Sequence, residues 1–174
     1  HQVIFNSGSS ESISTIFHSI AQNNLTREKD TIIISSIEHS AVNAVSKYYG
    51  QKGFKVKVLP TLTNGIINID HLSELVDQYR DNLALVSIMA ANNETGVIQP
   101  FETISKICTE YNIPYFSDTT QLIGKDHFNF NKSNITFSCL SGHKIGALMG
   151  TGILLAKDPS MLHPIIFGGG QENN

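Results

Sequence analysis

Residues 31–59, TIIISSIEHSAVNAVSKYYGQKGFKVKVL, decide the fold because they combine a strand, a helix and a second strand in one short stretch. Residues 31–35 are a compact β-branched run without polar alternation, which is typical of a strand covered on both faces of a sheet. Residues 39–51 are expected to form a helix, and residues 54–59 a second strand. Strand, helix and strand in this order are typical of an α/β sheet with crossover helices.

The same alternation continues on both sides of this unit. Further strands are expected at residues 2–6, 83–89, 114–117, 135–140 and 151–156, and further helices around Ile13, Ile16, Phe17 and Ile20 and at residues 70–79 and 101–111. A length of 174 residues fits one domain with a sizeable core. We therefore predict a single α/β domain over residues 1–174.

The composition argues against several classes of function. The chain is 40% hydrophobic and 16% charged, with a formal net charge of −3 and an isoelectric point near 6.1. Nothing in this balance favours a nucleic acid or an anionic membrane as a partner. No apolar run approaches the roughly 18–20 residues of a membrane span, and no signal peptide pattern is evident. The spacing of His and Cys predicts no metal site, and we expect a cytoplasmic or organelle-matrix location.

Polar residues gather where the predicted strands end. In an open α/β sheet, ligands bind outside the carboxyl ends of the strands, in the loops that lead to helices. Five such places carry hydroxyl, imidazole, amide, carboxylate or amine groups, at residues 7–10, 38–40, 92–94, 118–121 and 141–144. Together they predict one convergent site. Taken singly, each segment is also explained as an ordinary helix cap or turn.

Five short motifs follow one another along the chain: Glu38-His39-Ser40, Asn92-Asn93-Glu94-Thr95-Gly96, Asp118-Thr119-Thr120-Gln121, Ser141-Gly142-His143-Lys144 and Gly168-Gly169-Gly170-Gln171-Glu172. In order and spacing they resemble the motifs of cysteine desulfurases, in the class-V aminotransferase family, which have a Ser-x-His-Lys signature. The resemblance implies the large domain of fold-type-I enzymes that depend on pyridoxal 5'-phosphate. Such a domain has a mixed, mainly parallel sheet flanked by helices.

The resemblance assigns roles to five residues around that cofactor. Lys144 matches the lysine that holds the cofactor aldehyde as a Schiff base and shuttles protons. Asp118 matches the carboxylate that keeps the pyridine nitrogen protonated, since an opposite charge favours the charged form. His39 matches the imidazole that stacks on the ring and transfers protons near the substrate. Gln121 and Asn93 would hydrogen-bond the phenolic oxygen of the ring and the substrate region.

A phosphate site is expected at the start of the first helix. Gly8, Ser9 and Ser10 supply backbone N–H groups, hydroxyls and the positive end of the helix dipole. By resemblance, Ser141 and His143 complete the cup. The family commonly has Gly-Ala-Thr at the helix start, and Ser10 keeps the hydroxyl. A serine-rich helix start is also a capping signal in its own right.

The resemblance also implies parts of the enzyme that this chain lacks. Members of the family have a further N-terminal segment and a small C-terminal domain. The missing part includes the mobile-loop cysteine that becomes the persulfide and the arginine that binds the substrate carboxylate. Cys108 and Cys139 fall in expected core elements and do not match that cysteine. Leu148 and Met149 stand where a proline and a polar or basic residue are common. We expect this chain to be the cofactor-binding core, without efficient turnover of cysteine.

The activity implied for the enzyme is conversion of L-cysteine to L-alanine. The sulfur would pass as a persulfide to protein acceptors such as an iron–sulfur scaffold, and the enzyme would be a homodimer. Two alternatives stay open: a related lyase of the same fold, such as a selenocysteine lyase, and a non-catalytic, truncated cofactor-binding domain. The His39, Asn93 and Gln171-Glu172 segments favour the desulfurase. Retention of Lys144, Asp118, His39 and Gln121 together argues against a decayed site.

Overall fold

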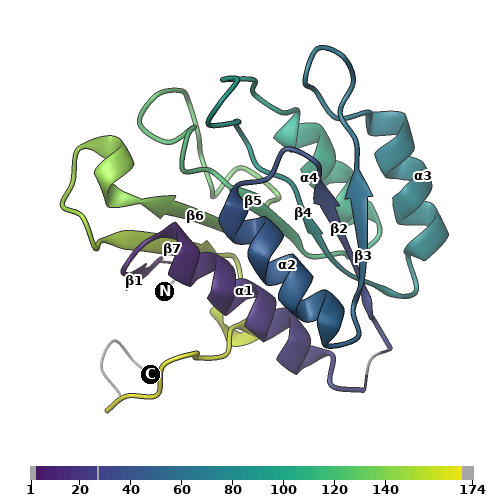
Figure 1. Cartoon of the computed structure of the whole chain (residues 1–174), viewed down its shortest axis with the longest axis horizontal. Helices are drawn as coiled ribbons and strands as arrows, with labels where there is room; N and C mark the ends of the chain where they lie inside the picture. The colour runs from purple at the N-terminus through teal and green to yellow at the C-terminus, as the bar shows by residue number, and fades with distance from the viewer. Residues whose placement is uncertain (1–2, 27, 170–174) are drawn as a thin grey trace.

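A seven-stranded sheet runs through the computed structural model, which describes residues 3–26 and 28–169 (Figure 1). Its strands are β1 (Val3–Asn6), β2 (Thr31–Ser35), β3 (Lys55–Leu59), β4 (Leu83–Ser87), β5 (Tyr115–Asp118), β6 (Phe137–Ser141) and β7 (Gly152–Ala156). Their order across the sheet is β1-β7-β6-β5-β4-β2-β3. The five neighbouring strands β6, β5, β4, β2 and β3 pair in parallel, whereas β7 is antiparallel to both β6 and β1. The predicted mixed, mainly parallel sheet is confirmed.

Helices cover both faces of the sheet: α1 (Ser9–Asn23), α2 (Ser40–Gln51), α3 (Ile69–Tyr79) and α4 (Phe101–Glu110). Ile13 and Phe17 of α1, which lies beside α2 in Figure 1, pack with Ile32 and Ile34 of β2. On the opposite face, Ile33 packs with side chains from α3 and α4. Successive side chains of a strand point to opposite faces. The isoleucines of β2 therefore fill both halves of the core, as the absence of polar alternation predicted.

The topology brings the polar segments to one edge of the sheet. Strands β2, β4, β5 and β6 run in the same direction, so their carboxyl ends meet there. Strand β1 runs in this direction too, because it is antiparallel to β7, which is antiparallel to β6. The segments that follow these five strands are the ones in which the sequence predicted a site.

Two of the expected site residues lie inside strands rather than in the loops after them. Asp118 is the last residue of β5 and is paired with Cys139, while Ser141 is the last residue of β6 and is paired with Gly152. The strands continue this far because a neighbouring strand still offers backbone partners. By contrast, the strand expected at residues 83–89 is regular only as far as its fifth residue. The sheet itself therefore fixes Asp118 and Ser141.

Several other expectations can be compared with the structure. Cys108 in α4 and Cys139 in β6 are both buried, as predicted. In the described ranges, none of the helices combines the length and apolarity needed to cross a bilayer. The same ranges contain no cluster of His, Cys, Asp and Glu suited to a metal ion. Gln2, expected to begin the first strand, and residues 170–172 of the glycine-rich motif lie outside the described residues.

Candidate functional site

A pocket of about 230 Å³ opens at the carboxyl edge of the sheet. Its lining contains all nine residues that the sequence placed at a site: Ser9, Ser10, His39, Asn93, Asp118, Gln121, Ser141, His143 and Lys144. Met89, Ala91 and Thr120 also line it. These residues come from five separate segments of the chain. The fold thus gathers the predicted residues around one cavity.

The first turn of α1 forms one wall of the pocket. The Ser9 N–H donates to Oγ of Ser141 at 2.9 Å, and that hydroxyl donates to Oγ of Ser9, also at 2.9 Å. Oγ of Ser9 lies 2.6 Å from Oγ1 of Thr120. The first N–H groups of a helix have no partner within the helix and lie at the positive end of its dipole. These three hydroxyls form a cup around the turn, called the hydroxyl cup below, and this arrangement suits an anion such as phosphate.

This hydroxyl cup depends on a close approach between β7 and the turn before α1. A Cβ atom at Gly152 would lie 2.4 Å from Cα of Gly8 and 2.6 Å from Oδ1 of Asn6. Gly8 has a φ of 151°, and its N–H donates to Oδ1 of Asn6 at 3.1 Å. Nδ2 of Asn6 donates to Oγ of Ser12 at 2.6 Å, which ties the turn to α1. Glycine at position 152 leaves the room for the turn that directs α1 at the pocket.

Asp118 lines the pocket from the end of β5 and is 5% exposed. Its Oδ1 accepts the N–H of Thr120 at 3.0 Å and the thiol of Cys139 at 3.6 Å. Within the described part of the chain, Oδ2 makes no hydrogen bond. Carboxylate oxygens that are mostly removed from water need a partner, and a charged N–H donor is the strongest one. Oδ2 is therefore the atom through which Asp118 would hold a ligand.

A second carboxyl group, that of Glu38, lies near Asp118 but does not line the pocket. Oε1 of Glu38 accepts the hydroxyl of Ser35 at 2.5 Å and the N–H of Met89 at 2.8 Å. Oε2 is buried and has no partner among the described residues. Burial raises the pKa of Glu38 to about 8; the Asp118 carboxyl adds to the rise, while the two hydrogen bonds oppose it. Near pH 7 this carboxyl is therefore mostly neutral.

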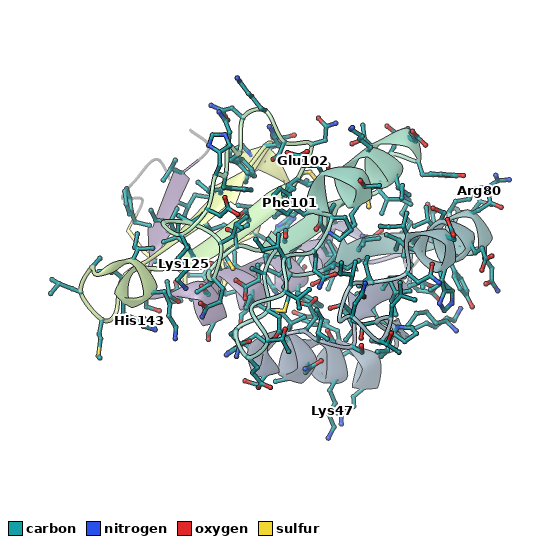
Figure 2. The ribbon with its side chains drawn as sticks, turned by 90° about the horizontal axis from the view of Figure 1, so that it is seen from above. Lys47, Arg80, Phe101, Glu102, Lys125 and His143 are labelled. Carbon is teal, nitrogen blue, oxygen red and sulfur yellow. The ribbon has the colours of Figure 1, made fainter. Side chains whose placement is uncertain are left out.

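Lys144 lies on the short 3-10 helix η1 (Gly142–Ile145), directly after β6. This turn closes when the N–H of Ala147 donates to the carbonyl of Gly142 at 2.9 Å. Figure 2 shows this turn, labelled at His143, at one end of the molecule. Lys144 lines the pocket and forms no ion pair with another described residue. An amine placed beside an anion-binding cup can attack a carbonyl carbon of the bound molecule.

Three more predicted residues, His39, Asn93 and Gln121, belong to the rim of the pocket. His39 is exposed and caps α2, where its Nδ1 accepts a backbone N–H of that helix at 3.2 Å. Asn93 is exposed in the loop after β4. Gln121 accepts a hydrogen bond from Nζ of Lys125. The ring stacking of His39 and the ligand contacts of Asn93 and Gln121 stay predictions.

Four residues at or next to the pocket had no role assigned from the sequence. Thr120 lies inside the Asp118 motif, so its hydroxyl could have been proposed for the cup. Met89 and Ala91 are apolar residues near a strand end, and no pattern separates them from core residues. Glu38 precedes His39, and an isolated Glu is by default a surface residue. Its burial emerges only from the packing of β2 against β4.

The mixed sheet, the pocket at its carboxyl edge, and the lysine and the hydroxyl cup that line this pocket suit an aminotransferase-like domain. Residues 1–174 match the family model described as Aminotransferase class-V, and the chain belongs to this family. More narrowly, the chain is similar to cysteine desulfurases. It is 40% identical over 173 residues to the cysteine desulfurase IscS of Rickettsia prowazekii, and 39% identical over 173 residues to the probable mitochondrial cysteine desulfurase of Schizosaccharomyces pombe.

Solved structures show the same likeness in three dimensions. A NifS-like protein superposes with a TM-score of 0.93 at 39% identity, over 99% of this chain and 47% of that one. SspA in complex with cysteine superposes with a TM-score of 0.92 at 35% identity, over 99% of this chain and 49% of that one. The two alignments cover 98% of this chain, but the chain spans only 41% of the length of the R. prowazekii relative and 34% of that of the S. pombe relative.

Proposed function

We propose that this chain forms the cofactor-binding domain of a pyridoxal-phosphate-dependent cysteine desulfurase. The enzyme would convert L-cysteine to L-alanine and transfer the sulfur as a persulfide. One observation carries the proposal: a single pocket brings together Lys144, the carboxylate of Asp118 and the hydroxyl cup at the start of α1. The similarity to cysteine desulfurases supports the choice of reaction within the family.

The residues of the pocket fit this cofactor group by group. The hydroxyls of Ser9, Thr120 and Ser141, with the N-terminal turn of α1, suit its phosphate. Oδ2 of Asp118, which makes no hydrogen bond to the described residues, suits the protonated ring nitrogen. Lys144 suits the aldehyde, to which it would bind covalently through Nζ. When bound, pyridoxal phosphate would supply a ring that withdraws electrons from the α-carbon of the amino acid.

The protein's own groups would do the proton transfers. Nζ of Lys144 would take the α-proton of the substrate, since a lysine freed from its covalent bond becomes a general base. Asp118 would keep the ring nitrogen protonated through Oδ2. His39 has its Nδ1 engaged by the backbone of α2, so Nε2 is the atom that would donate or accept a proton above the pocket.

The two cysteines in this chain do not suit the role of persulfide carrier. Thiolates, rather than thiols, are the nucleophiles in sulfur transfer. Burial raises the pKa of Cys108 to about 12 and the pKa of Cys139 well above its ordinary value. Both side chains are also closed off in the core. The acceptor cysteine would therefore be contributed by another part of the enzyme.

An exposed apolar loop supports a homodimer with the site near the interface. Leu148 is 80% exposed and Met149 is 88% exposed, a few residues after Lys144. Large apolar side chains at such exposure favour contact with another protein surface. We propose a second copy of the enzyme there. An iron–sulfur scaffold is the proposed sulfur acceptor, and the cytoplasm or an organelle matrix is the proposed location.

Titration of the cofactor-loaded chain with L-cysteine tests this function, with L-serine as the matched control. We expect L-cysteine to change the visible absorbance at concentrations where L-serine has a much smaller effect. Sustained formation of alanine is not expected, because Cys108 and Cys139 are buried. Equal responses to both amino acids would contradict a cysteine-specific site, and sustained turnover would contradict the need for a cysteine from elsewhere.

A further inference from the structure

Glu38 is a buried acid that the proposed chemistry does not use. It is 7% exposed, lies between the ends of β2 and β4, and has one carboxyl oxygen without a partner among the described residues. Acidic side chains are seldom buried to this extent unless a charge partner compensates them. The two ion pairs in the described part of the chain lie elsewhere. The position of Glu38 therefore needs an explanation.

The backbone around Met89 supplies that explanation. After β4 ends at Ser87, the N–H groups of Ile88 and Ala90 donate to two carbonyls of β5, at 3.1 and 2.9 Å. The N–H of Met89, which alternates with them, points to the other side, where β2 would continue. Strand β2 has ended by then. Oε1 of Glu38 occupies the acceptor position instead, 2.8 Å from this N–H.

This bond is one of two that tie the loop after β2 to the loop after β4. In the other, Nδ2 of Asn92 donates to the carbonyl of Ile37 at 2.9 Å. The first loop continues into His39, and the second carries Met89 and the residues up to Asn93. The segments joined by Glu38 thus present one side of the pocket.

We propose that Glu38 is a positioning residue, whose carboxyl group replaces a strand carbonyl and fixes His39 relative to the loop of residues 89–93. The consequence for cofactor binding rests on the function proposed above. The positioning itself does not, because it concerns bonds that the chain makes on its own. The neutral form of the carboxyl suits this place, since Oε2 has neither a donor nor a cation to stabilise a charge.

Two titratable groups on β5, Asp118 and Tyr115, lie close enough to interact with the carboxyl. His39 follows Glu38 in the chain and is exposed. The phenol of Tyr115 stays neutral, because burial raises its pKa well above the ordinary value. Ionisation of Glu38 would place a negative charge close to the Asp118 carboxyl group, and this proximity adds to the burial that raises the pKa of Glu38 to about 8. Above about pH 8 the bond to Met89 should therefore have a charged acceptor, and its amide signal should report the change.

Amide exchange and chemical shifts in the cofactor-free chain test the positioning directly. The variants are Glu38→Gln, which keeps Oε1, and Glu38→Ala, which removes it; Ser46→Ala is the control, since its buried hydroxyl also lacks a partner. We expect the protection factor of the Met89 amide to fall about tenfold in Glu38→Ala, which corresponds to the loss of one hydrogen bond. Glu38→Gln and Ser46→Ala should keep it. The wild-type Met89 amide should shift near pH 8, and Glu38→Gln should abolish this shift.

Wild-type protection in Glu38→Ala, or a pH-dependent shift that survives in Glu38→Gln, would overturn the proposal. If the Ala variant does not fold, the Gln variant decides alone: loss of Met89 protection in it contradicts the role. Cofactor affinity is the second readout, with about a tenfold loss expected for Glu38→Ala and none for Glu38→Gln. If no variant, nor the wild type, binds pyridoxal phosphate, the proposed function fails, while the exchange data still decide on Glu38.

Discussion

The pocket joins two regions that are built in opposite ways. The first, called the floor here, consists of Asp118 and Ser141 in the pocket lining together with Glu38, which lies next to the lining; these side chains are 5–8% exposed and held by side-chain hydrogen bonds between segments far apart in the chain. The lysine loop, residues 143–151, is exposed along its whole length and held by short-range bonds. One such bond runs from Oγ1 of Thr151 to the carbonyl of Leu148 at 2.6 Å.

The difference indicates that the domain orders the floor by its own contacts, whereas the lysine loop is expected to be completed by contacts with another surface. The floor is preorganised, because each of its side chains forms at least one hydrogen bond to a distant segment of the chain and lies at or next to the end of a strand. The lysine loop carries large apolar side chains into solvent, so its final environment is expected to include another protein surface. Substitutions in the floor should therefore cost stability and ligand affinity, whereas substitutions in the loop should change mainly association.

The largest predicted effect concerns the pH dependence of stability through Glu38. Its pKa is raised in the folded chain from an ordinary 4.5 to about 8. The stability that the neutral carboxyl contributes is therefore complete below about pH 4.5 and is lost as the pH rises towards 8. The free energy of unfolding should fall by about 1.4 kcal/mol per pH unit between about pH 5 and 7.5. Urea unfolding of wild type and Glu38→Gln over this range measures the difference.

In that experiment the Gln variant is the control for all other titrating groups, because it differs from the wild type only at Glu38. The difference between the two curves should grow with pH and become flat above about pH 8. A constant difference across the range would show that Glu38 ionises normally in the folded chain, and the floor would then be less isolated from water than the structure indicates.

The second prediction concerns the close approach that builds the hydroxyl cup. Gly152→Ala places a Cβ atom against the backbone of Gly8 at 2.4 Å. Backbone atoms cannot move aside cheaply, so we expect a loss of about 2–3 kcal/mol in the free energy of unfolding. Gly50→Ala is the control, because its nearest contact is the Val56 side chain at 3.7 Å and alanine favours a helix. Equal stability of the two variants would mean that the turn adapts.

The third prediction concerns the cup itself. Ser141→Ala removes the acceptor for the Ser9 N–H and a donor to its hydroxyl. The loss should be about 1 kcal/mol in the free energy of unfolding, with weaker binding of pyridoxal phosphate in a fluorescence titration. Ser14→Ala is the control, since that exposed serine bonds only within α1. Unchanged cofactor affinity in Ser141→Ala would remove this hydroxyl from the phosphate site.

The smallest predicted effect on stability is in the lysine loop. Met149→Ser should change the free energy of unfolding by less than about 0.5 kcal/mol, because the side chain is exposed. The same substitution should reduce self-association of the chain, which light scattering across a concentration series measures. A wild-type chain that stays monomeric at high concentration would argue against a second copy at this loop.

The sequence predicted most of the fold and the residues around the pocket. The isoleucine run of β2 identifies a strand buried on both faces. The order of the motifs predicted nine site residues, and all nine line one pocket. It did not predict the roles of Glu38 or Gly152, because both depend on contacts between segments distant in the chain. Nor did it show that Asp118 and Ser141 belong to strands, since strand ends are set by the neighbouring strand rather than by the residues themselves.

Borohydride reduction of the chain with bound pyridoxal phosphate, followed by peptide mapping, tests whether Lys144 holds the cofactor in this pocket. We expect one reduced adduct, on Lys144, which Lys144→Arg abolishes and Lys125→Arg leaves intact. An adduct spread over surface lysines, or one that persists in Lys144→Arg, would contradict the assignment of this pocket as the cofactor site.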